Sequence, residues 1–272
     1  MFERREIGFA LALPAAIFAA LLFLLPVGIL LSEAFMAEGH FSLKGYTDFF
    51  AVPLNQRVFI RTLKIGFLVT LASAVIGYAC AFAIVNLPAS ERGKIFGLVI
   101  LPLMISPVAR TYAWIVILGR TGIVNDVIVG LGLSDTPLRL LFTETAVFIG
   151  LLQLFMPLMI ISLVSAMENM PSNVVPAARV LGAGWLQVFW RVIIPLTKEG
   201  LVMGGTLVFA GSLTAYITPA ILGGAKVLML ETLLYQRVNV SNDYVSASVI
   251  AMILITMSFG TNQLLKRVSS RR

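Results

Sequence analysis

The 272-residue chain is poor in charge, in cysteine and in histidine. Only 12% of its residues are charged, about half of what soluble domains carry, whereas 59% are hydrophobic. A water-soluble enzyme or DNA-binding domain of this length could not cover its surface, and intrinsic disorder requires low hydrophobicity. The single cysteine, Cys80, excludes an internal disulfide framework and a multi-cysteine metal site, and the lone His40 cannot form a histidine cluster.

The chain contains several long apolar runs. A transmembrane helix needs about 20 mostly apolar residues, whereas strands of a membrane barrel show segments of about ten alternating residues. We therefore predict an all-α integral membrane protein with six transmembrane helices. Their expected bounds are Ile7–Leu31, Ile65–Val85, Ile95–Leu118, Ala146–Met167, Leu201–Leu222 and Val245–Leu265.

These spans divide the chain into three parts. Residues 1–64 hold the first helix and an outer interfacial segment, residues 65–265 hold a core of five helices, and residues 266–272 form a basic tail. With both termini in the cytoplasm, the inner segments contain eleven basic and five acidic residues, and the outer segments contain eight of each. Cytoplasmic loops carry such a basic excess, so the net charge of +7 indicates topology and contact with anionic lipid rather than nucleic-acid binding.

The segment of residues 168–200, between the fourth and fifth spans, is too polar to cross a membrane. Ala177, Ala178 and Leu181 form a compact apolar strip at helical spacing, and Gly182 permits a sharp turn before a second apolar stretch. Two short helices are expected. An exposed helix of small residues on the cytoplasmic side fits either a docking site for a partner protein or a helix lying on the membrane surface.

This segment resembles a motif of ABC-importer permeases. Ala177 and Ala178, then Gly182, Ile193 and Pro195, are similar to E-A-A-x3-G-x9-I-x-L-P. Two further stretches, 110–125 and 216–224, resemble the spermidine/putrescine branch of that family. The resemblance implies that the docking surface for the ATPase comprises Pro176, Ala177, Ala178, Arg179, Gly182, Ala183, Ile193 and Pro195.

One position departs from the motif, because Pro176 stands where the family has Glu. The resemblance assigns that Glu a contact with the nucleotide-binding subunit. Its loss removes one charged anchor and leaves the helix and the turn. Pairing with the ATPase is then expected to depend more on Arg179 and on shape.

The resemblance also implies the fold, the partners and the mechanism. It implies a type I ABC importer permease in the bacterial inner membrane, where two permease subunits, identical or not, form the pore. A pair of ATP-binding subunits would dock on the cytoplasmic face, and a periplasmic binding protein would deliver a polyamine. ATP and magnesium would bind to the partner, because the chain has no G-x-x-x-x-G-K-[ST] loop. No cofactor and no enzyme activity are expected in the chain itself.

Arg110 is the only charge within a predicted span. A charge at bilayer depth costs about 2.5–3.5 kcal/mol on insertion scales, so Arg110 should face protein or water. It either lines the outer translocation path or snorkels to the outer interface. If a polycation passes it, a nearby carboxylate such as Asp126 or Glu144 is required. Arg61 and Lys64, just before the second span, are expected to snorkel to outer headgroups.

The fifth span is rich in glycine and proline, which permit a helix break whose backbone lines a cavity. Tyr216 and Thr218 are candidates for the gate of the path, and ordinary close packing is the alternative. Tyr112 and Trp114 either line the path or anchor the helix at the membrane interface.

Two other classes of membrane protein remain alternatives. A secondary transporter or channel driven by an ion gradient would need a carboxylate inside a span, and the six predicted spans contain none. A membrane scaffold without transport would not need the docking helix. Within the importer interpretation, phosphonate, opine and inorganic-ion substrates remain alternatives to polyamines.

Overall fold

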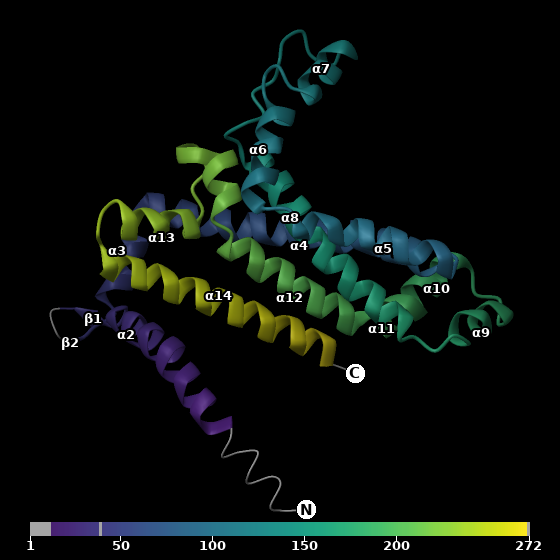
Figure 1. Ribbon diagram of the computed structural model, residues 1–272, viewed down its shortest axis with the longest axis horizontal. Coiled ribbons are helices and arrows are strands. Elements are labelled where there is room, and N and C mark those ends of the chain that lie inside the picture. The colour runs from purple at the N-terminus through teal and green to yellow at the C-terminus, as the bar shows by residue number, and fades with distance from the viewer. Residues whose placement is uncertain (1–11, 38–39, 271–272) are drawn as a thin grey trace, which may run out of the picture. The chain divides into compact units, whose positions relative to one another are not determined.

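The computed structural model describes residues 12–37 and 40–270, which are mostly helical (Figure 1). The chain forms two compact units. The first comprises residues up to Gln56 together with Leu234–Ile255, and the second comprises Arg57–Leu233 with the C-terminal residues from Thr256. The predicted start of the first span at Ile7 and the last two residues of the basic tail lie outside the described residues.

The first unit opens with an apolar helix, Ala12–Glu33, whose later part is a π-helical turn followed by α2. A short antiparallel hairpin follows, in which Met36 pairs with Phe41. The unit also holds the end of α13 and the first half of α14. Its elements in chain order are η1 (Ala20–Leu24), α2 (Leu25–Glu33), β1 (Met36–Ala37), β2 (His40–Phe41) and α3 (Lys44–Ala51).

The second unit contains the remaining elements, with α4, α13 and α14 extending into both units. They are α4 (Pro53–Val85), α5 (Ala89–Met104), α6 (Pro107–Leu118), α7 (Ile123–Gly130), α8 (Glu144–Glu168), α9 (Val174–Val180), α10 (Trp185–Val188), η2 (Phe189–Ile193), α11 (Ile194–Leu196), α12 (Lys198–Thr214), η3 (Pro219–Gly223), η4 (Gly224–Lys226), α13 (Leu230–Asn239) and α14 (Tyr244–Ser270).

The core of the second unit lies where α8 packs along α12. Leu151 and Leu163 of α8 and Leu213 of α12 are fully buried. The two backbones approach closely because α12 carries glycine at the contact. A Cβ atom at Gly204 would lie 2.7 Å from Sδ of Met159, so any larger residue would force the helices apart.

Five helices are long and apolar enough to cross a membrane, and a bent pair, Trp185–Leu196 with Lys198–Thr214, makes a sixth if counted as one span. The prediction of a helical protein with several membrane-spanning segments is therefore confirmed. Two of the expected spans, however, differ from the helices of the structure.

The expected third span, Ile95–Leu118, is wrong as a single helix. Helix α5 ends at Met104, and α6 begins at Pro107. Ser106 is extended (φ −51°, ψ 130°), because the ring of a following proline disfavours helical backbone in the residue before it. The stretch long enough to span is Pro107–Gly130, further along the chain.

The expected fifth span, Leu201–Leu222, is also wrong as a single helix. Helix α12 ends at Thr214, and Ala215 is extended. The chain then turns through η3, which contacts α6 and α8. Gly150 of α8 makes room for this turn, since a Cβ atom there would lie 2.6 Å from the Thr218 methyl group. The break that the glycine and proline content permits is therefore present.

Candidate functional site

The segment of residues 168–200 folds into short helices, as predicted. Helix α9 is followed by a turn and by α10, which continues through η2 and α11. A bend of 69° then joins this second stretch to α12. The second stretch is longer than α10 alone, because the backbone stays helical through the π-helical turn η2 and into α11, which contains Pro195.

The turn after α9 explains the glycine of the motif. Gly182 has φ +83°, in the left-handed region that favours glycine. Its N–H donates to the carbonyl of Arg179 at 2.9 Å, and the N–H of Ala183 donates to the carbonyl of Ala178 at 3.0 Å. This pair of bonds is the Schellman arrangement, in which glycine follows the last helical residues. The Ala-Ala-x3-Gly spacing thus places glycine at the one position that requires it.

The tip of α9 presents an apolar surface. Val180 and Leu181 are each 87% exposed, and Leu186 and Trp190 of the next stretch are exposed as well. Within residues 12–37 and 40–270, no side chain covers them. The sequence prediction included Leu181 in its apolar strip and missed Val180, because helical spacing alone does not say which side of so short a helix is buried.

The expected docking residues fall into three groups by exposure. Pro176, Ala177, Arg179 and Gly182 are exposed together with Pro195, whereas Ala178 and Ala183 are half-buried. The guanidinium of Arg179 lies over the Trp185 ring, 5.7 Å from its centroid. Ile193 is buried in the core and so anchors the segment rather than presenting a surface.

Contacts at the base of the segment fix it to the helices of the core. Hydroxyls of Tyr78 on α4 and Thr197 share a buried hydrogen bond of 3.0 Å. The rings of Phe82 and Trp185 stack at a tilt, with centroids 4.9 Å apart. These contacts join the second stretch of the segment and the residue before α12 to α4.

The residues expected to line the translocation path lie on α6 and on the segment that follows the end of α12 at Thr214. Thr218 is buried, and its hydroxyl lies 3.3 Å from that of Thr111 on α6, so these two segments touch. Tyr112 is exposed, whereas Trp114 and Tyr216 are half-buried. The structure thus brings Thr218 to the helix that carries Tyr112 and Trp114.

Arg110 is half-buried in the first turns of α6. Its Nε and Nη1 atoms are buried without a hydrogen-bond partner in the described part of the chain. Neither of the two carboxylates expected to pair with Arg110 does so, because Glu144 pairs with Arg61 and Lys64 and Asp126 makes no ion pair with Arg110. Within the described residues, these two guanidinium nitrogens therefore remain unsatisfied.

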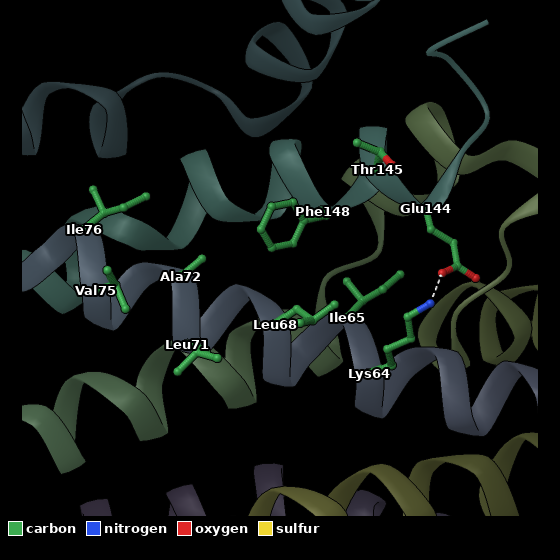
Figure 2. Close-up of a pocket in the computed structure, with 10 residues that line it drawn as sticks. All are labelled: Lys64, Ile65, Leu68, Leu71, Ala72, Val75, Ile76, Glu144, Thr145 and Phe148. Carbon is green, nitrogen blue, oxygen red and sulfur yellow. Dashed lines mark hydrogen bonds and ion pairs between the residues drawn. The ribbon is translucent and has the colours of Figure 1, made fainter.

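Glu144, at the start of α8, is held by two cations of α4, of which Figure 2 shows Lys64. Nε of Arg61 donates to Oε1 at 2.9 Å, and Nζ of Lys64 donates to Oε2 at 2.7 Å. Nη1 of Arg61 also donates to the carbonyl of Leu228, at 3.1 Å. Both side chains thus turn to this acid, a pairing that the sequence analysis did not predict.

Next to the ion pairs lies a cavity of about 570 Å³ between α4 and α8. Apolar side chains line most of it, among them Leu68, Val75 and Phe148, and the Lys64–Glu144 pair closes one end (Figure 2). The long sequence separation between Glu144 and its partners left no local signal from which the sequence could have predicted this cluster.

The chain after the break is fixed by hydrogen bonds of its backbone. The N–H of Leu230 donates to Oγ1 of Thr62 at 3.0 Å, and the N–H of Phe142 donates to the carbonyl of Leu222 at 2.8 Å. Glu231 follows at the start of α13, and burial raises the pKa of its carboxyl above the ordinary value. Thr62 of α4 and Phe142, just before α8, thus fix the irregular segment between α12 and α13.

Residues 92–271 match the family described as the binding-protein-dependent transport system inner membrane component. The chain belongs to this family. It is 32% identical to the spermidine/putrescine transport system permease protein PotB of Haemophilus influenzae, over 93% of this chain and 94% of that protein. It is 36% identical to PotB of Escherichia coli, over 70% of this chain and 69% of that protein.

The same fold occurs in a solved structure of a bacterial ABC transporter involved in the import of the acidic polysaccharide alginate. The TM-score is 0.82 at 16% identity, with 99% of this chain and 96% of the other covered. The fold is therefore that of an ABC importer permease. The family resemblance inferred from the motif is confirmed.

Membership of the binding-protein-dependent family makes the chain a transport subunit of the bacterial inner membrane rather than an enzyme. The matched residues include the 168–200 segment, Glu144 and the break after α12. Within the described ranges, no three His, Cys, Asp or Glu side chains come close enough to hold a metal ion.

Replacing Glu144 by Gln should destabilise the permease core, because Arg61 and Lys64 would lose their shared carboxylate. After allowance for partial exposure, we expect a loss of about 1–2 kcal/mol, measured as a lower melting temperature of the purified protein in detergent. Glu91→Gln is the control, since Glu91 pairs with Lys94 at an exposed i,i+3 position. Equal shifts in the two variants would show that the Glu144 cluster does not stabilise the core.

Proposed function

We propose that the chain is a transmembrane subunit of an ATP-driven importer and forms part of the path for a polyamine, putrescine or spermidine. The observation that carries this proposal is the 32–36% identity to two permeases that are named for these substrates. The first of these alignments extends over nearly the whole of both chains. Import of a phosphonate, an opine or an inorganic ion is the alternative on the same fold.

The proposed topology has six spans of type I permease arrangement and places both termini in the cytoplasm. The five candidate spans and the bent pair support the number six. The basic excess of the segments that would face inward supports the orientation. In this topology residues 1–64 hold the first helix and an outer segment, 65–265 hold the core, and 266–272 form the cytoplasmic tail.

The 168–200 segment is proposed to dock on a pair of ATP-binding subunits. The exposed apolar tip at Val180 and Leu181 supports a protein partner, and the Schellman turn at Gly182 keeps the tip in one conformation. ATP and magnesium would bind to those partner subunits. Closure of the ATPase pair would then move α9 as a rigid body. The open and the closed ATPase pair would each stabilise a different arrangement of the pore, and this difference would drive the conformational change.

Two further partners complete the proposal. A second permease subunit, identical or not, would face the side of α6 that carries Arg110. The buried nitrogen atoms of Arg110 that lack a partner support such a contact, either with that subunit or with water in the path. A periplasmic binding protein would deliver the solute, as the family description states for the family.

An ion-gradient mechanism is less well supported. It would require a carboxylate within a span that can exchange a proton or bind a cation. Glu144 begins the span Glu144–Glu168, but both of its oxygens accept hydrogen bonds from fixed cations. Asp126 lies inside the span Pro107–Gly130, so it is the match of the chain to the binding-protein-dependent family that favours the ATP-driven importer. We therefore retain Arg110, Tyr112, Trp114, Tyr216 and Thr218 as the proposed lining of the path, with Tyr216 and Thr218 at its gate.

The permease should support polyamine uptake only together with its partners. We expect proteoliposomes that contain the permease pair and the ATPase to accumulate labelled putrescine or spermidine when ATP and the binding protein are both supplied. Omission of ATP, or of the binding protein, serves as the control. Uptake that proceeds without ATP in response to an imposed ion gradient would overturn the ABC mechanism for this chain.

Substitution of Gly182 by Ala should weaken docking of the ATPase. A left-handed backbone costs a non-glycine residue about 1–2 kcal/mol. This cost lowers the equilibrium constant for forming the turn by about five- to thirtyfold. Gly184→Ala is the matched control, because Gly184 has φ −67° and neither glycine has an atom within 4 Å of a built Cβ. Co-purified ATPase is the measurement, and equal recovery in both variants would contradict a role for the turn.

Substitution of Arg110 by Ala should lower ATP-driven uptake by about tenfold at unchanged expression, equivalent to ~1.4 kcal/mol. The physical reason is that its guanidinium binds a group across the path. Arg57→Ala removes an exposed arginine of α4 and provides the control. If uptake survives in the Arg110 variant, Arg110 does not belong to the path.

A further inference from the structure

A small acidic cavity lies within the first unit, apart from the residues discussed above. It has a volume of about 280 Å³ and is formed by α3, by residues 52–55 and by the turn between α13 and α14. Its polar lining consists of Asp48, Asn55, Arg237 and Asp243 together with Ser246. Three acidic or amide side chains therefore meet one arginine in an enclosed space.

Asn55 is the strongest sign of a missing ligand. It is only 4% exposed, and its Nδ2 donates to the carbonyl of Phe49 at 3.0 Å. That bond fixes the orientation of the amide, because a backbone carbonyl can only accept. Oδ1 is then a buried acceptor without a donor in the described residues. Buried acceptors of this kind are uncommon in native proteins and call for a hydrogen-bond donor.

The carboxylates beside Asn55 retain capacity to accept hydrogen bonds. Oδ1 of Asp243 accepts from the N–H of Ser246 at 3.1 Å, while Oδ2 lies 3.5 Å from Nη1 of Arg237, at the limit of a hydrogen bond. Asp48 is exposed and has no hydrogen bond or ion pair in the described ranges. With two carboxylates and one guanidinium, the cavity carries a net charge of −1.

The remaining wall is apolar. Phe49, Val52, Val245 and Val249 line the cavity beside the three acceptors. A primary ammonium group has three N–H donors, which matches the acceptors of Asp48, Asn55 and Asp243, and its alkyl chain would contact the apolar wall. A hydrated divalent metal ion requires about six oxygen ligands and gains nothing from valine, so it fits this lining less well.

We propose that this cavity binds the ammonium end of an alkylamine, as an entry site for the solute. The identity of the solute and the outward orientation of the cavity rest on the function proposed above. The volume is slightly below the range of about 300–1,000 Å³ that is typical of small-ligand pockets, and so suits one end of a diamine. Arg237 competes with the amine for the carboxylate of Asp243 and so keeps the affinity of the cavity for the amine low.

The test uses the full permease–ATPase complex in lipid nanodiscs without binding protein. The probes are putrescine and n-butylamine, and bound probe is measured by equilibrium dialysis. We expect Asp48→Asn and Asn55→Leu to weaken binding of both probes at least tenfold. Arg237→Gln should strengthen it several-fold. Asp135→Asn, the same change at an exposed loop aspartate outside the cavity, should leave it unchanged.

A local measurement keeps the proposal testable if Asn55→Leu does not fold. Water-soluble carbodiimide with glycine ethyl ester modifies accessible carboxylates, and modification of Asp48 in the unaltered complex is quantified by mass spectrometry. We expect n-butylamine to protect Asp48 and to leave Asp135 fully reactive. Equal reactivity of Asp48 with and without the amine, or unaltered binding in Asp48→Asn, would overturn the proposed site.

The two proposals fail in distinguishable ways. Uptake of putrescine that needs ATP and binding protein, combined with unaltered amine binding in Asp48→Asn, would refute the entry site and leave the polyamine importer intact. Protection of Asp48 by n-butylamine without any polyamine uptake would confirm an amine site and refute the proposed substrate.

Discussion

The core of the permease depends on the contact between Glu144 and the two cations of α4. A helix that breaks at membrane depth exposes backbone groups that hydrocarbon cannot satisfy. Between η4 and α13 the chain is irregular, and there Arg61 donates to the carbonyl of Leu228 while Thr62 accepts from the N–H of Leu230. Glu144 neutralises Arg61 and so permits a charged side chain to act as this support.

Helix α12 connects the two regions to which we assign function. Its N-terminal end follows the 168–200 segment directly, and its C-terminal end is the break before η3. Its 17 residues span about 25 Å at 1.5 Å per residue. Close packing of α12 against α8 at Gly204 leaves little room for bending. A displacement at one end therefore reaches the other as movement of a rigid rod.

The sequence was sufficient to predict features that depend on neighbouring residues. Apolar runs predicted the helices, and the spacing of Gly182 from Ala177 and Ala178 predicted the turn, because a Schellman ending is a local arrangement. Contacts between distant segments were not predictable. Glu144 lies 80 or more residues from its partners, and a hydropathy average does not register that Pro107 ends one helix and starts another.

The environments of Arg110 and Asn55 also depend on contacts between distant segments, so the sequence could not predict them. Each is a polar side chain whose buried atoms find no partner in the described chain. In an importer, a site must attract its solute and yet release it, so tight binding at one place would stop transport. In the proposed entry site, Arg237 beside the acceptors of the Asn55 cavity would weaken the attraction for an amine. In the proposed path, Arg110 would bind a group across the path, and that pairing would keep its charge from repelling a polyamine.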